Sequence, residues 1–155
     1  MSHNPDRCPA CGFVLKQKRS RQHHNFFFAC LDEAYANWPS AHRFQPASVE
    51  HLRHWLLVQA GYHNVIGQNL TEDSGDVYRM ADFTARILQH TRTTGSSGFV
   101  EITGEHSIIV KFPKSISWRT LDQKAFTPIA EAIFQIVEHE TGIKTEDLKK
   151  HTESA

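Results

Sequence analysis

The segment that most constrains the fold lies near the C-terminus, at residues 122–142. Its stretch IAEAIFQIVEHETG repeats apolar residues at the helical period, so one face of the helix must be buried. Asp122 can cap the start of this helix and Gly142 can close its end. Pro128 is tolerated in a first turn or marks a kink. The segment therefore predicts a long amphipathic helix.

Two earlier stretches, residues 20–38 and 48–61, also repeat apolar residues with helical spacing. Pro39 should stop the first of these helices. Ser48 is placed to cap the second helix, and Gly61 follows its last turn. Together with the elements around them, these helices predict one hydrophobic core. Its expected members are Phe27, Leu31, Trp38, Leu52, Trp55, Leu56, Ile109, Phe126, Ile133 and Phe134.

The middle of the chain predicts a third helix and a β-hairpin. DVYRMADFTARILQHTR has helical character and ends before the GSSG loop at residues 95–98. FVEIT and HSIIVKF flank Gly104 and Glu105 with alternating apolar positions, which is typical of two paired strands. A short extended piece is expected around Val65. The predicted fold class is α+β, a mainly helical single domain with a β-hairpin.

Length and composition narrow the class of protein. The 155 residues suffice for one domain with its own core. We expect a cysteine-turn appendage at residues 1–15, a core domain at 16–143 and a short tail at 144–155. Seventeen basic and seventeen acidic side chains give a formal net charge of zero, which argues against indiscriminate binding to DNA.

The same composition bears on the compartment. The sequence has no apolar run of about 18 residues and no charged-then-apolar leader, so we expect no membrane span and no secretory signal. Its three cysteines, an odd number, argue against a disulfide framework. A cytoplasmic protein is the expectation.

The strongest local chemical signal is the turn Cys8-Pro-Ala-Cys11-Gly12. A CxxC turn followed by glycine lets two thiolates converge on one ion, forming half of a zinc knuckle. The nearest further ligands are His24 and Cys30 on the first predicted helix, with another histidine as a substitute for Cys30. The expected structural zinc site is Cys8, Cys11, His24 and Cys30.

Other interpretations of these cysteines stay open. The turn could bind no metal, or it could be a redox pair, although the βαβ context of a thioredoxin-type site is missing. For Cys30 the alternative is a small hydrophobic side chain buried among phenylalanines.

The first predicted helix begins in a basic stretch, whose cations are Lys16, Lys18, Arg19 and Arg21. Cations at a helix N-terminus oppose the helix dipole, so folding stability gives no reason for them. A phosphate bound at the free N–H groups would reverse that effect. Phe26 or His23 could offer ring faces to unstacked bases. The stretch therefore predicts a nucleic-acid contact, with a solvated basic loop as the alternative.

Three motifs resemble phage proteins. Arg19-Ser20-x-Gln22-x-x-Asn25, running into FFACLDEAYANW, resembles the start of the phage NinB/Orf recombination-mediator proteins. SVEHLRHWLLVQAGY resembles the second helix of related small prophage proteins. PKSISWRTLDQKAF, followed by a long helix, resembles the C-terminal signature of an uncharacterised lambdoid-prophage family. These motifs span residues 16–142 in order.

The resemblance implies an accessory protein of phage DNA recombination or replication. Such a protein binds single-stranded DNA or a host single-strand-binding protein, often as a homodimer. The motif positions carried over are Arg19, Ser20, Gln22 and Asn25. Together with the basic stretch, the expected nucleic-acid contacts are Lys16, Lys18, Arg19, Arg21, Gln22 and Asn25.

Two other classes compete with this interpretation. A metal-dependent nuclease of HNH-like type is suggested by His23 and His24 beside a CxxC turn, but adjacent helical side chains point about 100° apart. No P-loop, GxSxG or GxGxxG motif is present, so we expect no catalytic activity. A DNA-binding regulator would use residues 48–61 as its recognition helix. Trp55 and Leu56 make that helix too apolar for a groove.

Overall fold

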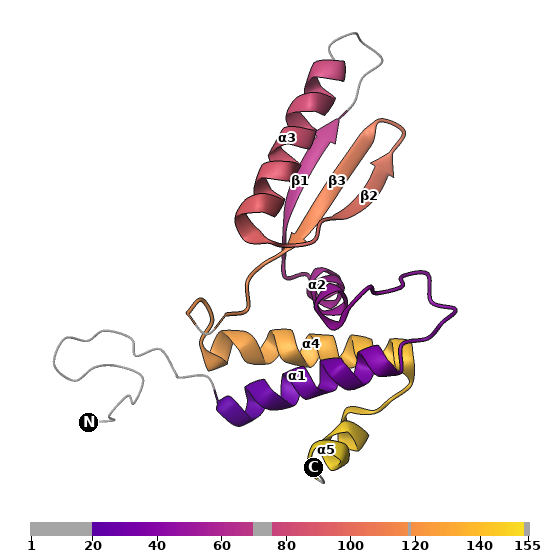
Figure 1. The fold of residues 1–155 in the computed structure, drawn as a ribbon, viewed down its shortest axis with the longest axis vertical. Coiled ribbons are helices and arrows are strands. Elements are labelled where there is room, and N and C mark those ends of the chain that lie inside the picture. Colours follow the sequence, from indigo (N-terminus) through magenta and orange to yellow (C-terminus); the bar gives the residue numbers. More distant parts are fainter. Residues whose placement is uncertain (1–19, 70–75, 118, 154–155) are drawn as a thin grey trace, which may run out of the picture.

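The computed structural model describes residues 20–69, 76–117 and 119–153, which form five helices and a three-stranded antiparallel sheet (Figure 1). The elements are α1 (Arg21–Ala36), α2 (Val49–Gln59), β1 (His63–Asn69), α3 (Asp76–Thr94), β2 (Phe99–Gly104), β3 (Ser107–Pro113), α4 (Gln123–Thr141) and α5 (Thr145–Glu153). This architecture confirms the predicted α+β class. None of the described helices is both long and apolar enough to cross a membrane.

Capping residues fix where the helices begin and end. Ser20, Ser48 and Asp122 are the N-caps of α1, α2 and α4, and each side chain accepts a hydrogen bond from the backbone N–H three residues later. Gly142 closes α4 in the left-handed region at φ 72°, where a side chain would be strained. Pro128 lies beyond the first turn, and α4 continues through it. The predicted boundaries at Ser48, Asp122 and Gly142 are confirmed.

Most of the hydrophobic core belongs to a helical base, which we define as α1, α2, α4 and α5. Twelve buried residues of the described chain form this cluster, and the predicted Trp38 and Phe134 pack against it half-buried. The cluster consists of Phe27, Leu31, Ala34, Leu52, Trp55, Leu56, Leu57, Ile116, Phe126, Ala130, Ile133 and Val137.

The remaining elements form a sheet layer, defined as β1, β2, β3 and α3. β3 lies between β1 and β2 and pairs antiparallel with both, so the extended piece expected around Val65 is the third strand. A separate small core consists of Phe83 on α3 with Val110 and Phe112 on β3.

The expectation that Ile109 belongs to the main core is wrong. Neighbouring residues of a strand point to opposite faces, and Val110 faces α3. Ile109 therefore lies on the other face, half-buried against Gly67 of β1.

The sheet layer stands on the helical base with α2 at the junction (Figure 1). The backbone N–H of Lys114 donates to the carbonyl of Tyr62, 3.1 Å away, which ties the segment after β3 to the one before β1. Ile116, two residues further on, is buried in the core of the base. The chain passes between the two layers twice, once between α2 and β1 and once between β3 and α4. These two connections hold the layers together.

The segment expected as a C-terminal tail contains a fifth helix. Leu148 of α5 is buried, and α5 contacts α1. The Glu138 carboxylate accepts the backbone N–H of Thr145 at the start of α5, 2.5 Å away. Hydrogen bonds from Thr145 lower the pKa of Glu138, because they favour the charged carboxylate. The tail is thus docked on the base.

Candidate functional site

The predicted DNA contacts are described only in part. Arg21, Gln22 and Asn25 are exposed on the first two turns of α1. Arg21 and His24 are three residues apart and share one stripe of the helix, whereas Gln22 points to the opposite side. The other predicted contacts lie outside the described residues: Lys16, Lys18 and Arg19.

The start of α1 is held by polar contacts to α4. The backbone N–H of Ser20 donates to the side-chain carbonyl of Gln123, 2.8 Å away. The Ser20 hydroxyl accepts the N–H of His23. The N–H groups of Arg21 and Gln22 lie in the first turn, where a helix offers them no carbonyl acceptor of its own. No acidic residue lies in the first turn. This end of α1 is therefore electrostatically open to an anion.

Next to it, a pocket of about 280 Å³ opens between the helical base and the sheet layer. α1 contributes His24 and Phe28 to its wall, and α2 contributes Glu50, Arg53 and His54. The opposite wall comes from the end of α3 and from the segment after β3, namely Thr94, Gly95, Ser96, Pro113, Lys114, Ser115, Ile116 and Ser117. This volume lies just below the usual range for ligand pockets, about 300–1,000 Å³.

Arg53 is the cation on the α2 wall. Its guanidinium forms an ion pair with Glu50 and lies 5.6 Å from the ring centroid of Phe28. The Nε atom of Arg53 is buried and has no hydrogen-bond partner. The ring of His24 also packs against Phe28, with the two centroids 4.7 Å apart. Phe28 thus positions two nitrogen-bearing side chains at the pocket.

Lys114 is the cation on the opposite wall. It is exposed, and its ammonium lies 5.6 Å from the ring centroid of Tyr62. In the described part of the chain, Lys114 takes part in no ion pair. The hydroxyl of Ser115 beside it accepts the N–H of Ser117 and keeps its own proton for another acceptor.

His54 connects the two layers beside this pocket. Its Nε2 lies 3.1 Å from Oε1 of Glu50, and its Nδ1 lies 3.4 Å from the hydroxyl of Ser97. His54 is 8% exposed, and this burial lowers its pKa below the ordinary value despite the nearby Glu50 carboxylate. His54 is therefore neutral at pH 7 and acts as a hydrogen-bonded link between α2 and the loop before β2.

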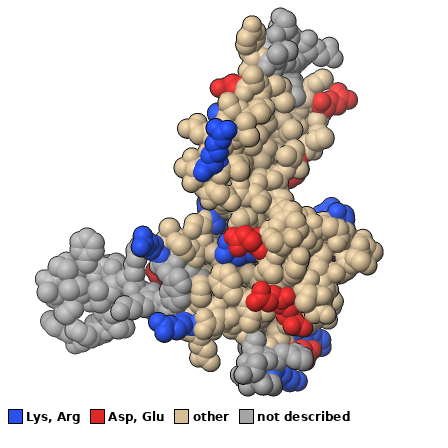
Figure 2. All heavy atoms as spheres, viewed as in Figure 1, with Lys and Arg blue, Asp and Glu red and all other residues tan. Residues whose placement is uncertain are grey.

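Charges of both signs are spread over the surface. Figure 2 shows Lys and Arg side chains next to Asp and Glu side chains at the junction between the layers, and no large patch of one sign on the described part of this face. This agrees with the formal net charge of zero. Any anion contact must therefore depend on local groups such as Arg53 and Lys114.

The two rings proposed from the sequence for base stacking both contact side chains of α4. His23 packs edge-on against Phe126, and its Nδ1 lies 2.6 Å from the side-chain amide nitrogen of Gln123. Phe26 packs edge-on against Phe134. These half-buried rings pack α1 against α4, and base stacking on them stays a prediction. Phe28 packs half-buried against the core and also lines the pocket.

The predicted zinc ligands are not brought together in the described residues. Cys8 and Cys11 lie outside them. Cys30 is 1% exposed in the core, whereas His24 lines the pocket. Six residues apart on one helix, the two side chains are about 9 Å apart along the axis and point to different sides. Among the described residues, no group of three His, Cys, Asp or Glu side chains could hold a metal ion.

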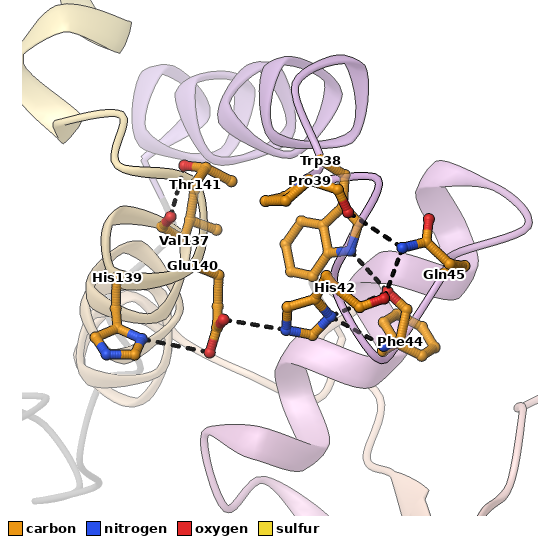
Figure 3. Close-up of polar contacts among 9 residues, drawn as sticks. All are labelled: Trp38, Pro39, His42, Phe44, Gln45, Val137, His139, Glu140 and Thr141. Carbon is orange, nitrogen blue, oxygen red and sulfur yellow. Dashed lines mark hydrogen bonds and ion pairs between the residues drawn. The ribbon is translucent and has the colours of Figure 1, made fainter.

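A second polar cluster joins the loop after α1 to the end of α4 (Figure 3). His42 Nε2 lies 3.0 Å from Oε2 of Glu140, and the backbone N–H of Phe44 donates to His42 Nδ1. The ring of His42 packs against Trp38 and Trp55. The cluster fastens the loop onto the core, and it is not predictable from sequence because Glu140 lies far from His42 in the chain.

The competing interpretation of residues 48–61 as a recognition helix does not fit the structure. Leu52, Trp55 and Leu56 are buried, and α2 lies between the base and the sheet layer (Figure 1). A helix enclosed in this way cannot enter a major groove.

Comparison of the chain with known protein families, with curated protein sequences and with solved structures gives no match.

Proposed function

We propose that the chain is an accessory protein of phage DNA recombination or replication, and that it binds single-stranded DNA at the junction of helical base and sheet layer. The supporting observation is a convergence of the three motifs that resemble phage proteins. His24 lies within the first motif, Glu50 and Arg53 belong to the second, and residues 113–117 are the PKSIS of the third. All of them line the same pocket.

The strand would reach the pocket along the start of α1. Arg21 is exposed on the same stripe as His24, and the sequence adds Lys16, Lys18 and Arg19 just before it. Cations with no acidic neighbour in the first turn attract the phosphate backbone irrespective of base sequence. Because the net charge is zero, binding is confined to this end of the molecule.

The proposed role is binding without catalysis. His23 contacts α4 and His24 lines the pocket, so the two histidines do not serve a common ion. The Ser97, His54 and Glu50 side chains form a chain of polar contacts, which we assign to holding the loop before β2. We therefore expect no cleavage of single- or double-stranded DNA in the presence of magnesium, manganese or zinc.

A protein partner is the second part of the proposal. The resemblance implies a host single-strand-binding protein, and a homodimer is a further expectation. The edge strand β2 carries Val100 and Ile102, which are 66% and 79% exposed. By register they face the α3 side of the sheet, beside Val110 and Ile108, where α3 leaves them uncovered.

A mobility-shift experiment tests the proposed function. The protein should shift an oligothymidine strand and bind a blunt duplex of equal length more weakly, because only a flexible strand can follow the start of α1 into the pocket. Pre-coating the strand with single-strand-binding protein separates the two partners, since a ternary complex requires a protein contact. Binding to neither the strand nor its coated form would contradict the proposal.

Structural zinc at Cys8 and Cys11 stays a prediction of the sequence. Freshly purified protein prepared without chelator should contain close to one zinc per chain, because a CxxC turn presents two thiolates to one ion. Cys8→Ser and Cys11→Ser should lose the metal, whereas Cys30→Ser should keep it, because Cys30 is buried in the core. Background metal content in the unmodified protein would contradict zinc binding.

A further inference from the structure

The pocket between the layers has features that the proposed binding of a strand does not by itself explain. Its two cations come from opposite walls, Arg53 from α2 and Lys114 from the segment after β3. Ser115 and Ser117 add hydroxyl groups beside Lys114. This combination of one guanidinium, one ammonium and adjacent hydroxyls is the donor set that phosphate oxygens accept from proteins.

The size of the pocket limits what it can hold. At about 280 Å³ it is smaller than most sites for large cofactors. A phosphate group with part of its nucleotide fits such a space, whereas a bulky apolar ligand would find the charged pair of Arg53 and Glu50 in its wall.

The contacts of the Arg53 guanidinium favour an anionic ligand in this pocket. Its Nη2 and the Nε2 of His54 both use the same carboxylate oxygen of Glu50, and its buried Nε has no partner. A buried donor without an acceptor is energetically unfavourable, and a ligand that accepts from it removes that cost. The Glu50 side chain is 58% exposed, so it can turn toward solvent and leave the guanidinium to a ligand.

We propose that this pocket binds one phosphate group of a nucleotide, with Arg53 and Lys114 as its cationic contacts and Ser115 as a hydroxyl donor. The proposal rests on the proposed function in one respect, because the bound strand would supply the phosphate. Glu50 is the competing anion, which Arg53 releases when the phosphate enters. The pocket accordingly fixes one backbone phosphate, while the cations at the start of α1 contact the neighbouring ones.

The probes are inorganic phosphate, thymidine 5′-monophosphate and thymidine, titrated at constant ionic strength and followed by the amide resonances of Gly95, Ser96, Ser115 and Ser117. Both phosphates should move these resonances with a dissociation constant on the order of 1 mM. Thymidine, which lacks the phosphate, should not. Shifts spread over the whole surface, or shifts with thymidine alone, would overturn the proposal.

Two substitutions should change the phosphate affinity in opposite directions. Lys114→Gln should weaken phosphate binding about tenfold, because it removes a charge-assisted contact. Glu50→Gln should tighten it about threefold, because it removes the competing carboxylate. Both residues are exposed, so the fold should survive each change. Lys144→Gln, an exposed lysine before α5, is the matched control and should leave binding unchanged.

The outcomes separate this inference from the proposed function. Phosphate binding at the pocket without any binding of oligothymidine would uphold the site and contradict the strand-binding role. Oligothymidine binding that is insensitive to Lys114→Gln, with no phosphate shifts at the pocket, would overturn the site and leave strand binding intact. Equal phosphate affinity in Lys114→Gln, Glu50→Gln and unmodified protein would also overturn it.

Discussion

The helical base and the sheet layer differ in how much apolar surface each one buries. In the described residues, the base has a core of twelve buried side chains, whereas the sheet layer has three, Phe83, Val110 and Phe112. Local stability follows the density of buried apolar contacts. The base should therefore stay folded under conditions that open the sheet layer, and a pocket between them has one rigid wall and one weaker wall.

The largest expected difference in stability between the two regions is between two substitutions of fully buried phenylalanines. Phe126 lies in the base and Phe112 in the sheet layer. Phe126→Ala should lower the free energy of unfolding by about 3–5 kcal/mol and affect the whole domain. Phe112→Ala should open mainly the sheet layer, because it removes one of the three residues of that core.

Hydrogen exchange of the backbone amides measures both effects. In Phe112→Ala the amides of β1 and β3 should lose protection while those of α1 and α4 keep theirs. Uniform loss of protection throughout the molecule would show that the two regions form one cooperative unit.

A smaller loss of stability is expected when a side chain is added to the tightly packed sheet layer. A Cβ at Gly98 would lie 2.8 Å from Cε1 of Phe112 and 2.9 Å from Cγ1 of Val110. Gly98→Ala should therefore destabilise the protein by about 1–3 kcal/mol. Gly67→Ala is the matched control in the same layer, because its Cβ would make an ordinary contact of 3.4 Å with Ile109. Equal midpoints of urea unfolding for the two variants would contradict the packing described for Gly98.

The junction itself should respond to pH through His54. Burial keeps the pKa of folded His54 below its ordinary value of 6.5. As the pH falls below 6.5, the unfolded chain therefore binds a proton that the folded protein does not yet take. Stability should then fall by at most about 1.4 kcal/mol per pH unit, and the loss should level off below the folded pKa.

Urea unfolding at pH 7.0 and 5.5 checks this prediction when unmodified protein is compared with His54→Gln. The variant cannot titrate at this position, so its loss of stability between the two pH values should be smaller. An equal loss in both proteins would mean that other histidines carry the pH dependence.

The two regions also differ in how well the sequence predicts them. Capping residues such as Ser48 and Asp122 and the closing Gly142 are local signals, so the helix boundaries at these positions followed from the chain. The sequence predicts only an extended piece around Val65, because Val65 pairs with Lys111 of β3, which is far away in the chain. Ile109 belongs to neither core of the described residues, because the sequence does not indicate which face of a hairpin a helix covers.

The candidate site was predictable only at one end. The basic stretch before α1 is a contiguous signal, whereas Arg53 and Lys114 come from distant segments and form a pocket only when the chain folds. Neither cation stands out locally, since one lies on a buried helix and the other follows a strand. The contacts of His23 and Phe26 with α4 likewise form only in the folded chain. The sequence alone therefore does not reveal that both rings pack against another helix.

The salt dependence of strand binding tests the central claim most directly. Fluorescence anisotropy of a labelled oligothymidine between about 50 and 200 mM salt should give a slope of log K against log salt of about −1.5 to −3, as expected for two to four phosphate contacts on a single strand. Replacing both Arg19 and Arg21 with Ala should flatten that slope, whereas replacing Lys149 and Lys150 near the acidic C-terminus should change little. Unchanged affinity and slope in the double arginine variant would contradict binding at the start of α1.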